Sequence, residues 1–497
     1  MKQNLVGLDI GTSCVKAAVF DENGKAIHVA SAPLQVFTPS AGWAEQDPEE
    51  YWTATCAALK GLFENIDPET VSGIGLSGQC PSHVLVDSSH RTLGRAIIWR
   101  DQRAEEEAKW MNQQVTAAQA LEWLGNAYLG DATSPPARLL WLKENRSADW
   151  SKAAAVLQPK DFVVLRLTER VGTDCHSAYC LANPDSGEYD PAYFKILGLP
   201  LEIMPPTFAP TEVMGEVTSQ AAQATGLKPG TKVVIGTIDA YCDNLAGGAI
   251  FPGRAVDVAG TSEIVSLGIE KPVAAEGVFP ATIGKDGMFL CGPTQAGGET
   301  LHWLARSFYS KFKDGIPFKP MEDEARGAPP GSAGLIFLPY LNGERAPIWD
   351  AHAVGGFVGL TFHHDRRHCT RAVYEGVAYA IRHILEISET AAASSTREII
   401  VCGGGSRSEF WNQIKADVLQ KIVRPTMVSE TGCLGAAILA GVGLGYHKSI
   451  KDGCLAMIQL KRGIQPEPKL SELYNNRYSR YRDLYPAMKM AFFGDGS

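Results

Sequence analysis

A short turn near the start of the chain, Gly11-Thr12-Ser13, limits what this sequence can fold into more than any other stretch does. Apolar residues alternate with other residues before it, at positions 6, 8 and 10, and after it, at positions 15, 17 and 19. An alternation with a period of two is typical of β-strands. The two strands and their short connection therefore predict a hairpin.

The residue types of this turn suit a phosphate group. A glycine followed by two hydroxyl residues directs backbone N–H groups and O–H donors into one small volume. Asp9, at the mouth of the turn, is able to hold Mg2+ through water, because Mg2+ takes one or two carboxylates and keeps most of its hydration. The alternative is an ordinary hairpin in which Thr12 and Ser13 satisfy the amides of the turn.

The same design recurs at residues 255–268, where an apolar strand, Gly260-Thr261-Ser262 and a second apolar strand follow one another. When the two turns are aligned, Val258 stands opposite Asp9, so the turn is repeated and the carboxylate is not. Asp257 lies one position earlier and faces the other side of its strand. Two such turns in the two halves of one chain predict a nucleotide held between two related domains.

Composition excludes several classes of function. The 497-residue chain has 46 basic and 55 acidic residues and a net charge of -9, which argues against nucleic acid or an anionic membrane as a partner. No apolar run reaches the roughly 20 residues of a membrane-spanning helix, and the first four residues lead into a strand, not a signal peptide. The eleven cysteines form no C-x-x-C pair, which indicates reduced thiols in a cytoplasmic protein.

The chain resembles the FGGY carbohydrate kinases, a family of the sugar kinase, actin and Hsp70 superfamily. The resemblance extends from Asp9-Ile10-Gly11-Thr12-Ser13 to Leu434-Gly435-Ala436-Ala437 and is strongest to the xylulose-phosphorylating members. It implies an α/β fold of two related ribonuclease H-like (actin-like ATPase) domains with a nucleotide and sugar cleft between them. We place the N-terminal domain at residues 1–248 and the C-terminal domain at residues 249–497.

The family implies an ATP-dependent sugar kinase that uses Mg2+, with Asp9 as the metal residue. D-xylulose or a related ketopentose is the expected substrate, and another pentulose, a tetritol such as erythritol, or glycerol is the alternative. Two other classes of protein stay open: an actin- or Hsp70-like ATP clamp that binds other proteins, and a sugar-sensing relative that binds ATP without turnover. A small-molecule sugar or polyol is the expected partner, and a homodimer is left open as the assembly.

The strand at residues 74–79 ends in small and polar residues, which is a common position for ligand sites in α/β sheets. In the family the loop here contacts the sugar. The resemblance makes five of its residues substrate-binding: Gln79, Cys80, Pro81, Ser82 and His83. Similar xylulose kinases carry Met-His-Gly where this chain has Cys80-Pro81-Ser82, and the missing histidine puts xylulose itself in question. On physical grounds alone, His83 is more often an ordinary loop histidine than a ligand.

A second strand end carries Trp99, Asp101 and Arg103, which match the W-x-D-x-R pattern of the family. An apolar ring face beside an acceptor and a donor fork suits a substrate with many hydroxyl groups. The resemblance makes these three residues sugar contacts. The alternative is a surface salt bridge beside a packed tryptophan.

The catalytic base is expected at the end of the strand over residues 232–239, where an acid precedes a helix rich in Ala and Gly. Phosphoryl transfer to a sugar hydroxyl needs an acceptor for the hydroxyl proton and in-line positioning. The family keeps its base here, and the spacing to Leu245 and Gly247-Gly248 favours Asp239 over Asp243. As the base, Asp239 also contacts the substrate. An N-cap aspartate is the alternative.

Three glycines are expected to lie against the nucleotide. A buried strand at residues 399–402 runs into Gly403, Gly404 and Gly405, and glycines let the backbone approach a flat ring. By resemblance this loop binds adenosine, and Asn412 in the helix that follows is a further contact. The ATP-binding residues that the resemblance implies are Gly11, Thr12, Ser13, Lys16, Gly260, Thr261, Ser262, Gly403, Gly404, Gly405 and Asn412.

Overall fold

The structure of the chain is a computed structural model that describes residues 4–125, 129–283, 285–295, 297–309 and 316–493. It divides into two compact units. Unit 1 consists of Met1–Ala246 and Glu430–Ile458, and unit 2 consists of Gly247–Ser429 and Gln459–Ser497. The sequence analysis expects two contiguous halves and therefore places Glu430–Ile458 in the second domain. In the structure this segment belongs to unit 1. The domain boundary at residue 248 stays a prediction.

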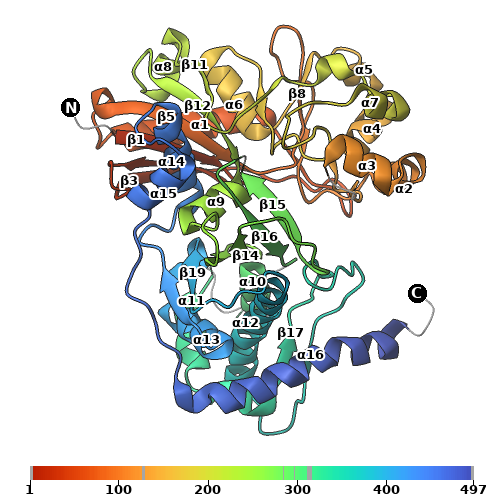
Figure 1. Cartoon of the computed structure of the whole chain (residues 1–497), viewed down its shortest axis with the longest axis vertical. Helices are drawn as coiled ribbons and strands as arrows, with labels where there is room; N and C mark the ends of the chain where they lie inside the picture. Colours follow the sequence, from red (N-terminus) through yellow and green to blue (C-terminus); the bar gives the residue numbers. More distant parts are fainter. Residues whose placement is uncertain (1–3, 126–128, 284, 296, 310–315, 494–497) are drawn as a thin grey trace. The chain divides into compact units, whose positions relative to one another are not determined.

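Unit 1 is built on a six-stranded mixed sheet with the order β11-β12-β5-β1-β2-β3 (Figure 1). Its strands are β1 (Asn4–Ile10), β2 (Cys14–Phe20), β3 (Ala26–Pro33), β5 (Val71–Gly78), β11 (Val213–Glu216) and β12 (Lys232–Ile238). β1, β2 and β3 form an antiparallel meander, and β5 and β12 run parallel to β1. Asp9 pairs with Lys16 across the first turn, so the predicted hairpin is confirmed.

Unit 2 repeats this arrangement in a sheet with the order β15-β16-β14-β13-β19-β20. Its strands are β13 (Ala255–Ala259), β14 (Glu263–Ile269), β15 (Phe279–Ile283), β16 (Gly287–Pro293), β19 (Glu398–Cys402) and β20 (Ile422–Pro425). β13, β14 and β16 are antiparallel, and β19 and β20 run parallel to β13. These five strands correspond in order and direction to β1, β2, β3, β5 and β12. The predicted α/β fold of two related domains is therefore confirmed.

Shorter elements surround the two sheets. The remaining strands are β4 (Glu45–Gln46), β6 (Val84–Val86), β7 (Ala96–Ile97), β8 (Ala155–Leu157), β9 (Thr173–Asp174), β10 (Thr207–Phe208), β17 (Ile336–Leu338) and β18 (Gly356–Val358). The 3-10 helices are η1 (Pro68–Thr70), η2 (Leu201–Ile203), η3 (Pro330–Gly334), η4 (Gly404–Arg407) and η5 (Pro468–Leu470).

The α-helices follow the division into units. Unit 1 contains α1 (Pro48–Phe63), α2 (Glu105–Gln114), α3 (Ala117–Leu124), α4 (Pro135–Asn145), α5 (Ser147–Trp150), α6 (Pro159–Thr168), α7 (Pro191–Leu197), α8 (Ser219–Thr225), α14 (Thr431–Gly443) and α15 (Ile450–Met457). Unit 2 contains α10 (Gly298–Phe308), α11 (Phe318–Ala325), α12 (Arg366–Ala391), α13 (Glu409–Leu419) and α16 (Ser471–Phe493). α9 (Asp239–Gly247) begins in unit 1 and ends on the first residue of unit 2.

The central strand of unit 1, β1, is covered on both faces. On one face Val6, Leu8 and Ile10 are fully buried in a core that includes residues of α1 and α6. On the other face α14 packs against β1 and β5, although it is made near the opposite end of the chain. In Figure 1 the blue ribbon of α14 accordingly lies beside the red strands.

Unit 2 has its own core, arranged around α12. Val373, Val377 and Ile381 on this helix are fully buried. They join apolar residues of β14 and β17, the strands on which α12 packs. Each unit therefore buries apolar surface of its own.

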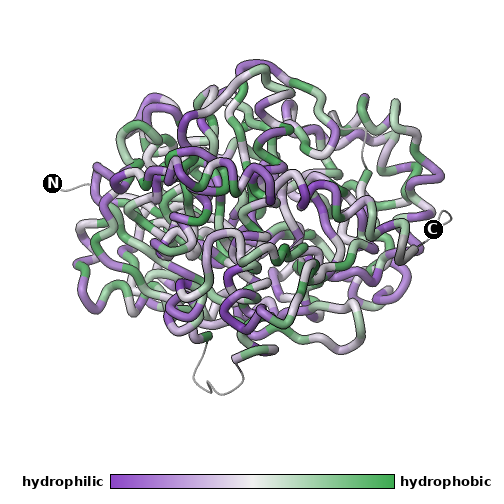
Figure 2. Tube along the Cα trace, turned by 90° about the horizontal axis from the view of Figure 1, so that it is seen from below, coloured by the Kyte–Doolittle hydropathy of each residue, from purple (hydrophilic) through white to green (hydrophobic). Residues whose placement is uncertain are grey.

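Hydrophobic stretches along the trace are short and alternate with hydrophilic ones (Figure 2). Within the described ranges, none of the helices is long and apolar enough to cross a membrane. The eleven cysteines, all of which lie in these ranges, carry free thiols. This agrees with the lack of C-x-x-C pairs in the sequence.

Helix α14 approaches its neighbours at backbone distance. A Cβ atom added to Gly7 would lie 1.8 Å from the carbonyl oxygen of Cys433, and one added to Gly75 would lie 2.0 Å from that of Ala436. A Cβ atom added to Gly435, on the helix itself, would lie 2.1 Å from a carbonyl oxygen of α9. Side chains at these positions would displace backbone, so only glycine fits them without a shift of the helix.

Gly75→Ala is expected to lower the free energy of unfolding by at least about 2 kcal/mol, because the added methyl group forces α14 away from β5. Gly61→Ala in α1 is the control, since its Cβ atom would meet Ala30 at an ordinary contact distance of 3.5 Å. The control should be neutral or stabilising by about 0.5 to 1 kcal/mol. Urea unfolding monitored by circular dichroism measures both, and equal effects would contradict the tight packing of α14.

Candidate active site

Asp9 lies where three elements of unit 1 meet. The hydroxyl of Ser77, on β5, donates to Asp9 Oδ1 at 2.8 Å. Lys16 stands opposite on β2. A Cβ atom added to Gly432 would lie 3.0 Å from Asp9 Cγ, so the carboxyl group faces the first turn of α14. The N-terminus of a helix favours a negative charge placed beside it.

Two further carboxylates of unit 1 lie near Asp9, on α9. Asp239 begins this helix directly after β12, and Asp243 follows one turn later. The backbone N–H of Ala240 donates to Asp239 Oδ1 at 2.7 Å. Asp243 Oδ1 accepts from the hydroxyl of Thr431 at 2.6 Å. This last bond links α9 to the start of α14.

The environment of these three carboxylates raises their pKa values. Burial raises the pKa of Asp9, and the opposing effects of Lys16 and Ser77 are smaller. Burial and the charges of Asp9 and Asp243 raise the pKa of Asp239 well above its usual range. Burial and Asp9 raise the pKa of Asp243 to about 7. A cluster of three carboxylates with raised pKa values favours the binding of a positive charge, either a proton or a metal ion.

Hydrogen bonds join the first Gly-Thr-Ser turn to residues predicted to contact the sugar. The hydroxyl of Thr12 accepts from the indole N–H of Trp99 at 2.9 Å and donates to Gln79 Oε1 at 3.4 Å. The side-chain amide of Gln79 donates to the carbonyl of Gly11 at 3.1 Å. Gln46 closes the network, since its amide donates to the carbonyl of Thr12 at 2.8 Å and its Oε1 accepts from Gln79 at 2.7 Å. The structure thus brings the turn, Gln79 and Trp99 together.

The predicted sugar loop, residues 79–83, is held by a second glutamine, Gln158. Gln158 Oε1 accepts from the backbone N–H of Ser82 at 2.8 Å, and the Gln158 amide donates to the carbonyl of Ser177 at 3.3 Å. The thiol of Cys80 faces the same carbonyl at 3.7 Å. The loop is therefore braced by the segment that follows β9.

Arg138 ties the sugar loop to the W-x-D-x-R segment. Its fully buried guanidinium donates to the carbonyl of Pro81 at 2.9 Å, to that of Trp99 at 2.5 Å and to that of Asp101 at 2.9 Å. Burial lowers its pKa to about 10, which leaves the side chain charged at neutral pH. One cation thereby positions two segments that the sequence analysis assigns to the substrate.

His83 lies in the interior of unit 1. Its backbone N–H donates to the carbonyl of Ile97 at 2.9 Å. Burial and Arg138 lower the pKa of the imidazole to about 3, so the ring is neutral. The described residues offer neither ring nitrogen a hydrogen-bond partner. A sugar contact by His83 stays a prediction.

Asp101 and Arg103 form a buried ion pair. Their side chains are fully buried, and Arg103 Nη2 lies 2.7 Å from Asp101 Oδ2. The guanidinium also contacts Glu45 at 2.8 Å and lies 3.7 Å from the ring centroid of Trp43. The ion pair of the alternative interpretation is present, but it is buried and not at the surface, and the ring beside it belongs to Trp43 and not to Trp99 of the motif. The predicted sugar contacts of Asp101 and Arg103 stay predictions.

In unit 2 the second Gly-Thr-Ser turn, residues 260–262, rests on the start of α10. The carbonyls of Gly260 and Thr261 accept from the backbone N–H groups of residues 297–299 at 2.9 to 3.0 Å. Gly260 and Thr261 themselves are exposed. The turn is thus fixed through its carbonyl groups, and its exposed side is open to a ligand.

Asp257 faces away from this turn, as the alternation along the strand predicts. Its Oδ2 lies 2.6 Å from Nζ of Lys415, on α13, and both side chains are buried. Val258 occupies the position that corresponds to Asp9 of unit 1. Unit 2 therefore repeats the turn without a carboxylate at its mouth.

The glycine loop, residues 403–405, leaves β19 in a left-handed conformation at Gly403, where φ is 72°. A Cβ atom added to Gly404 would meet no atom within 4 Å. One added to Gly405 would lie 2.6 Å from the Cβ atom of Ala259. The loop is thus open at its middle glycine and closely packed at its last one.

Asn412 supports this loop from α13. Its side chain is buried, and its amide donates to the carbonyl of Ser406 at 2.9 Å. The structure therefore gives Asn412 a bracing contact with the loop. Its predicted contact with ATP stays a prediction.

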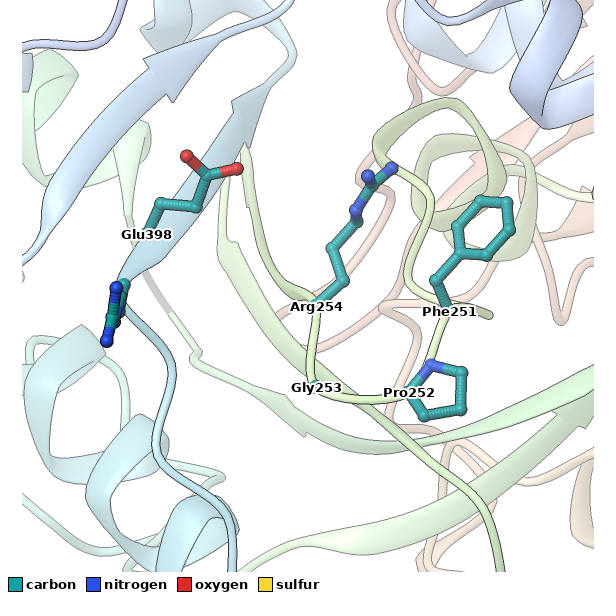
Figure 3. Close-up of a pocket in the computed structure, with 6 residues that line it drawn as sticks. Phe251, Pro252, Gly253, Arg254 and Glu398 are labelled. Carbon is teal, nitrogen blue, oxygen red and sulfur yellow. The ribbon is translucent and has the colours of Figure 1, made fainter.

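A pocket of about 280 Å³ lies elsewhere in unit 2 (Figure 3). It is lined by Phe251, Pro252, Gly253, Arg254, Arg397 and Glu398. These residues precede or begin β13 and β19, whereas the second Gly-Thr-Ser turn and the glycine loop follow the same strands. The pocket thus lies at the N-terminal ends of β13 and β19, whereas the predicted nucleotide residues lie at their C-terminal ends. None of these predicted residues lines the pocket.

Several residues that shape the site were missed in the sequence. Thr431 reaches Asp243 from a helix made almost 200 positions later, and no local pattern announces such a contact. Gln46 lies in a two-residue strand that has no motif. Gln158 did have a signal, because it is a polar residue directly after the apolar segment 155–157, the position at which strands commonly present ligand-site residues.

Comparisons with known proteins find similar chains and folds. Profiles of the FGGY family of carbohydrate kinases match residues 4–246 with the N-terminal domain and residues 255–444 with the C-terminal domain. The chain is 29% identical to a xylulose kinase of Staphylococcus epidermidis and 31% identical to an L-xylulose/3-keto-L-gulonate kinase of Escherichia coli, over 98% of both chains in each case. It is also similar to the crystal structure of gluconate kinase from Lactobacillus acidophilus, with a TM-score of 0.86 and 28% identity over 100% of both chains.

Asp243→Asn is expected to stabilise the protein at pH 8 and to leave its stability unchanged near pH 4. In the unfolded chain this carboxyl group ionises near pH 4, whereas in the fold its pKa is about 7. Ionisation therefore lowers the stability progressively between pH 4 and pH 7, and the asparagine removes a penalty on the order of 4 kcal/mol at most. Urea unfolding in metal-free buffer across this range measures the difference.

Asp350→Asn, in unit 2, is the control with the opposite sign. Hydrogen bonds from Lys489 and Tyr485 hold the pKa of Asp350 at about 2, so its ionised form supports the fold. This variant should be less stable than the wild type at pH 8, and the deficit should shrink as the pH falls below 4. A benefit of Asp243→Asn that is the same at pH 4 and pH 8 would contradict the raised pKa.

Proposed function

Because the chain belongs to the FGGY family of carbohydrate kinases and is an ATP-dependent sugar kinase, we propose that it phosphorylates a small, neutral, linear ketose. D-xylulose or a related ketopentose is the proposed acceptor. A relative named as a xylulose kinase, which aligns over nearly the whole chain, supports this choice. A second relative is named for both L-xylulose and 3-keto-L-gulonate, and the first of these two names supports a ketopentose.

The contacts of Thr12 carry the proposal. Its hydroxyl lies between the turn assigned to phosphate and two residues assigned to the sugar, Gln79 and Trp99. Asp9 and Asp239 belong to the same unit, and the charge of Asp9 raises the pKa of Asp239. Unit 1 by itself therefore offers adjacent places for a phosphate, a sugar hydroxyl and a proton.

Asp239 is the proposed general base. A carboxylate whose pKa is raised accepts a proton more readily at neutral pH than an ordinary aspartate does. A sugar hydroxyl oxygen would form the new bond to the γ-phosphorus as the bond from that phosphorus to the ADP oxygen breaks. The hydroxyl proton would pass to Asp239.

Mg2+ is the proposed metal ion, with Asp9 as its protein residue. Ser77 engages one oxygen of this half-buried carboxyl group, at the mouth of the turn. Among the described residues there is no group of three or more His, Cys, Asp or Glu that could hold a metal ion. Mg2+ takes one or two carboxylates and completes its shell with phosphate oxygens and water. When bound, the ion neutralises charge on the transferring phosphoryl group.

The remaining nucleotide contacts are assigned to unit 2. β13 and β19 are adjacent and parallel, so the second Gly-Thr-Ser turn and the glycine loop leave the same edge of the sheet. The turn is exposed at Gly260 and Thr261, and the loop is open at Gly404. One nucleotide could therefore place its phosphates on the turn and its adenosine on the loop.

A neutral sugar fits unit 1 better than a sugar acid. Three buried cations near the predicted sugar loop are already engaged: Arg103 with Asp101, Arg138 with three backbone carbonyls, and Lys160 with two carboxylates. A substrate carboxylate would have to compete with these partners for a cation, whereas hydroxyl groups would not. Gluconate is therefore the weaker choice, although a similar structure is a gluconate kinase.

Other acceptors are kept as alternatives: another pentulose, a tetritol such as erythritol, and glycerol. A sugar-sensing relative without turnover is the alternative of another class, and the presence of both Asp9 and Asp239 speaks against it. We also propose a cytoplasmic location, which the eleven free thiols support.

Purified protein is expected to release ADP in the presence of a ketopentose, ATP and Mg2+. The assay compares D-xylulose, L-xylulose, D-ribulose, erythritol, glycerol and D-gluconate, with and without EDTA. The highest kcat/KM should belong to a ketopentose, and EDTA should abolish turnover. ADP release that depends on no member of the panel would contradict the kinase assignment, and a preference for gluconate would contradict a neutral substrate.

Asp239→Asn is expected to lower kcat by roughly 10²- to 10⁴-fold, the usual contribution of a positioned general base. The Kd for ATP should stay within about twofold of the wild type, because the substitution removes a proton acceptor and no nucleotide contact. Asp243→Asn, one helical turn away, is the matched control and should cost less turnover. A larger loss in the control would move the role of base to Asp243.

A further inference from the structure

Each unit buries one lysine between two carboxylates. In unit 1, Nζ of Lys160 lies 2.6 Å from Asp161 and 2.8 Å from Asp174. In unit 2, Nζ of Lys415 lies 2.6 Å from Asp257 and 3.2 Å from Glu263. The lysine side chains are 1% exposed and the carboxylates 0%, so neither triad is an ordinary surface ion pair.

The two lysines occupy corresponding places in the repeated fold. Lys160 lies on α6, in the connection from β5 to β12, and Lys415 lies on α13, in the connection from β19 to β20. These are the fourth and fifth strands of the shared arrangement in each unit. The carboxylate partners differ in position, since Asp161 and Asp174 lie on α6 and β9, whereas Asp257 and Glu263 flank the second Gly-Thr-Ser turn.

Stability alone does not account for such groups. Removing charges from water costs several kcal/mol for each ion, and well-packed apolar residues often stabilise an interior as well or better. A buried cation does fix the positions of the groups that pair with it, because leaving one of them unpaired is unfavourable. The segments that each lysine holds in place therefore indicate what it serves.

Lys160 holds the base strand and the sugar loop. Its partner Asp174 also accepts from the hydroxyl of Thr237 at 2.7 Å, two residues before Asp239. Asp174 is bonded to the hydroxyl of Ser177 as well, and the carbonyl of Ser177 faces the thiol of Cys80. Lys160 lowers the pKa of Asp174 against the effect of burial, so this carboxylate stays ionised.

Lys160 also packs directly beneath the strand that leads to this loop. A Cβ atom added to Gly78, the last residue of β5, would lie 3.0 Å from the Cβ atom of Lys160. Gln79, the first residue of the predicted sugar loop, follows at once. The lysine is therefore fixed against both segments that unit 1 offers to the acceptor.

Lys415 holds the second Gly-Thr-Ser turn. Asp257 lies on the strand that enters the turn, and Glu263 is the first residue after it. Burial raises the pKa of Glu263 well above its usual range, with Lys415 opposing and Asp257 adding to the shift.

The same lysine is coupled to the glycine loop. Its ammonium group lies 4.3 Å from the ring centroid of Trp411. A Cβ atom added to Gly405 would lie 3.2 Å from an atom of that ring. Lys415 thus sets the position of the turn relative to the loop, which are the two nucleotide contacts assigned to unit 2.

We propose that Lys160 and Lys415 are positioning residues with separate duties, Lys160 for the sugar acceptor and Lys415 for the nucleotide. This inference rests on the proposed function. In this proposal neither lysine contacts a ligand. Each acts through the loops whose positions it fixes.

The test uses two charge-balanced variants of the full chain, Lys160→Met with Asp161→Asn and Lys415→Met with Asp257→Asn. Titration calorimetry gives the Kd for ADP and the Kd for the panel sugar with the highest turnover, which is D-xylulose in our proposal. The Lys415 variant should weaken ADP roughly tenfold or more and leave the sugar within about twofold, and the Lys160 variant should do the reverse. Each variant is the control of the other.

Lys232→Met with Glu216→Gln removes an exposed lysine–glutamate pair of unit 1 and should change neither Kd. If a charge-balanced variant does not fold, the single variants Asp161→Asn and Asp257→Asn, which keep both lysines, replace it. Asp161→Asn should then raise the Kd for the sugar, and Asp257→Asn the Kd for ADP, by roughly threefold. Unchanged affinities, or equal losses for both ligands in both variants, would overturn the proposal. A wild type that binds the sugar and ADP but shows no sugar-dependent ADP release would instead contradict the proposed function.

Discussion

The backbone contact between α14 and the sheet of unit 1 is the constraint on which the candidate site depends. Gly7 and Gly75 let the helix lie directly on β1 and β5, and this depth brings Gly432 to the carboxyl group of Asp9. The same placement carries Thr431 to Asp243. A helix held one side chain further out would leave both carboxylates without these neighbours. Small residues far from any ligand thus determine the electrostatics of the site.

A second constraint is the way the fold treats buried charge. Around the proposed base, carboxylates are placed close together without enough cations, and their pKa values rise. Behind the predicted sugar loop and behind the second Gly-Thr-Ser turn, a lysine is paired with two carboxylates, and the geometry is fixed. Unsatisfied charge suits groups that must bind a proton or an ion during turnover, and satisfied charge suits groups that must not move.

The local features of the fold could be predicted because their causes are local. The alternation around Gly11 and Gly260 determines both hairpins, and the apolar segments before Asp239 and Gly403 are strands as expected. The placement of Val258 opposite Asp9 follows from counting along a strand. In each case the residues that decide the structure are neighbours in sequence.

The rest of the site could not be predicted, because it depends on contacts between distant segments. Nothing near Thr431 indicates that its hydroxyl reaches Asp243, and nothing near Arg103 indicates that Glu45, a distant residue, pairs with it in the interior. The W-x-D-x-R pattern looked like a set of free polar groups suited to a sugar. In the structure Asp101 and Arg103 are buried and pair with each other. A pattern of residue types does not reveal this burial.

The crossing of Glu430–Ile458 back into unit 1 has a consequence for how the protein is made. During synthesis β1 and β5 leave the ribosome early, but the helix that covers their second face emerges only after almost the entire chain. The nascent N-terminal half therefore presents an uncovered sheet face, rich in glycine, for most of translation. Such surfaces are prone to association with other chains, and in unit 1 this face is covered only when residues 430–458 arrive.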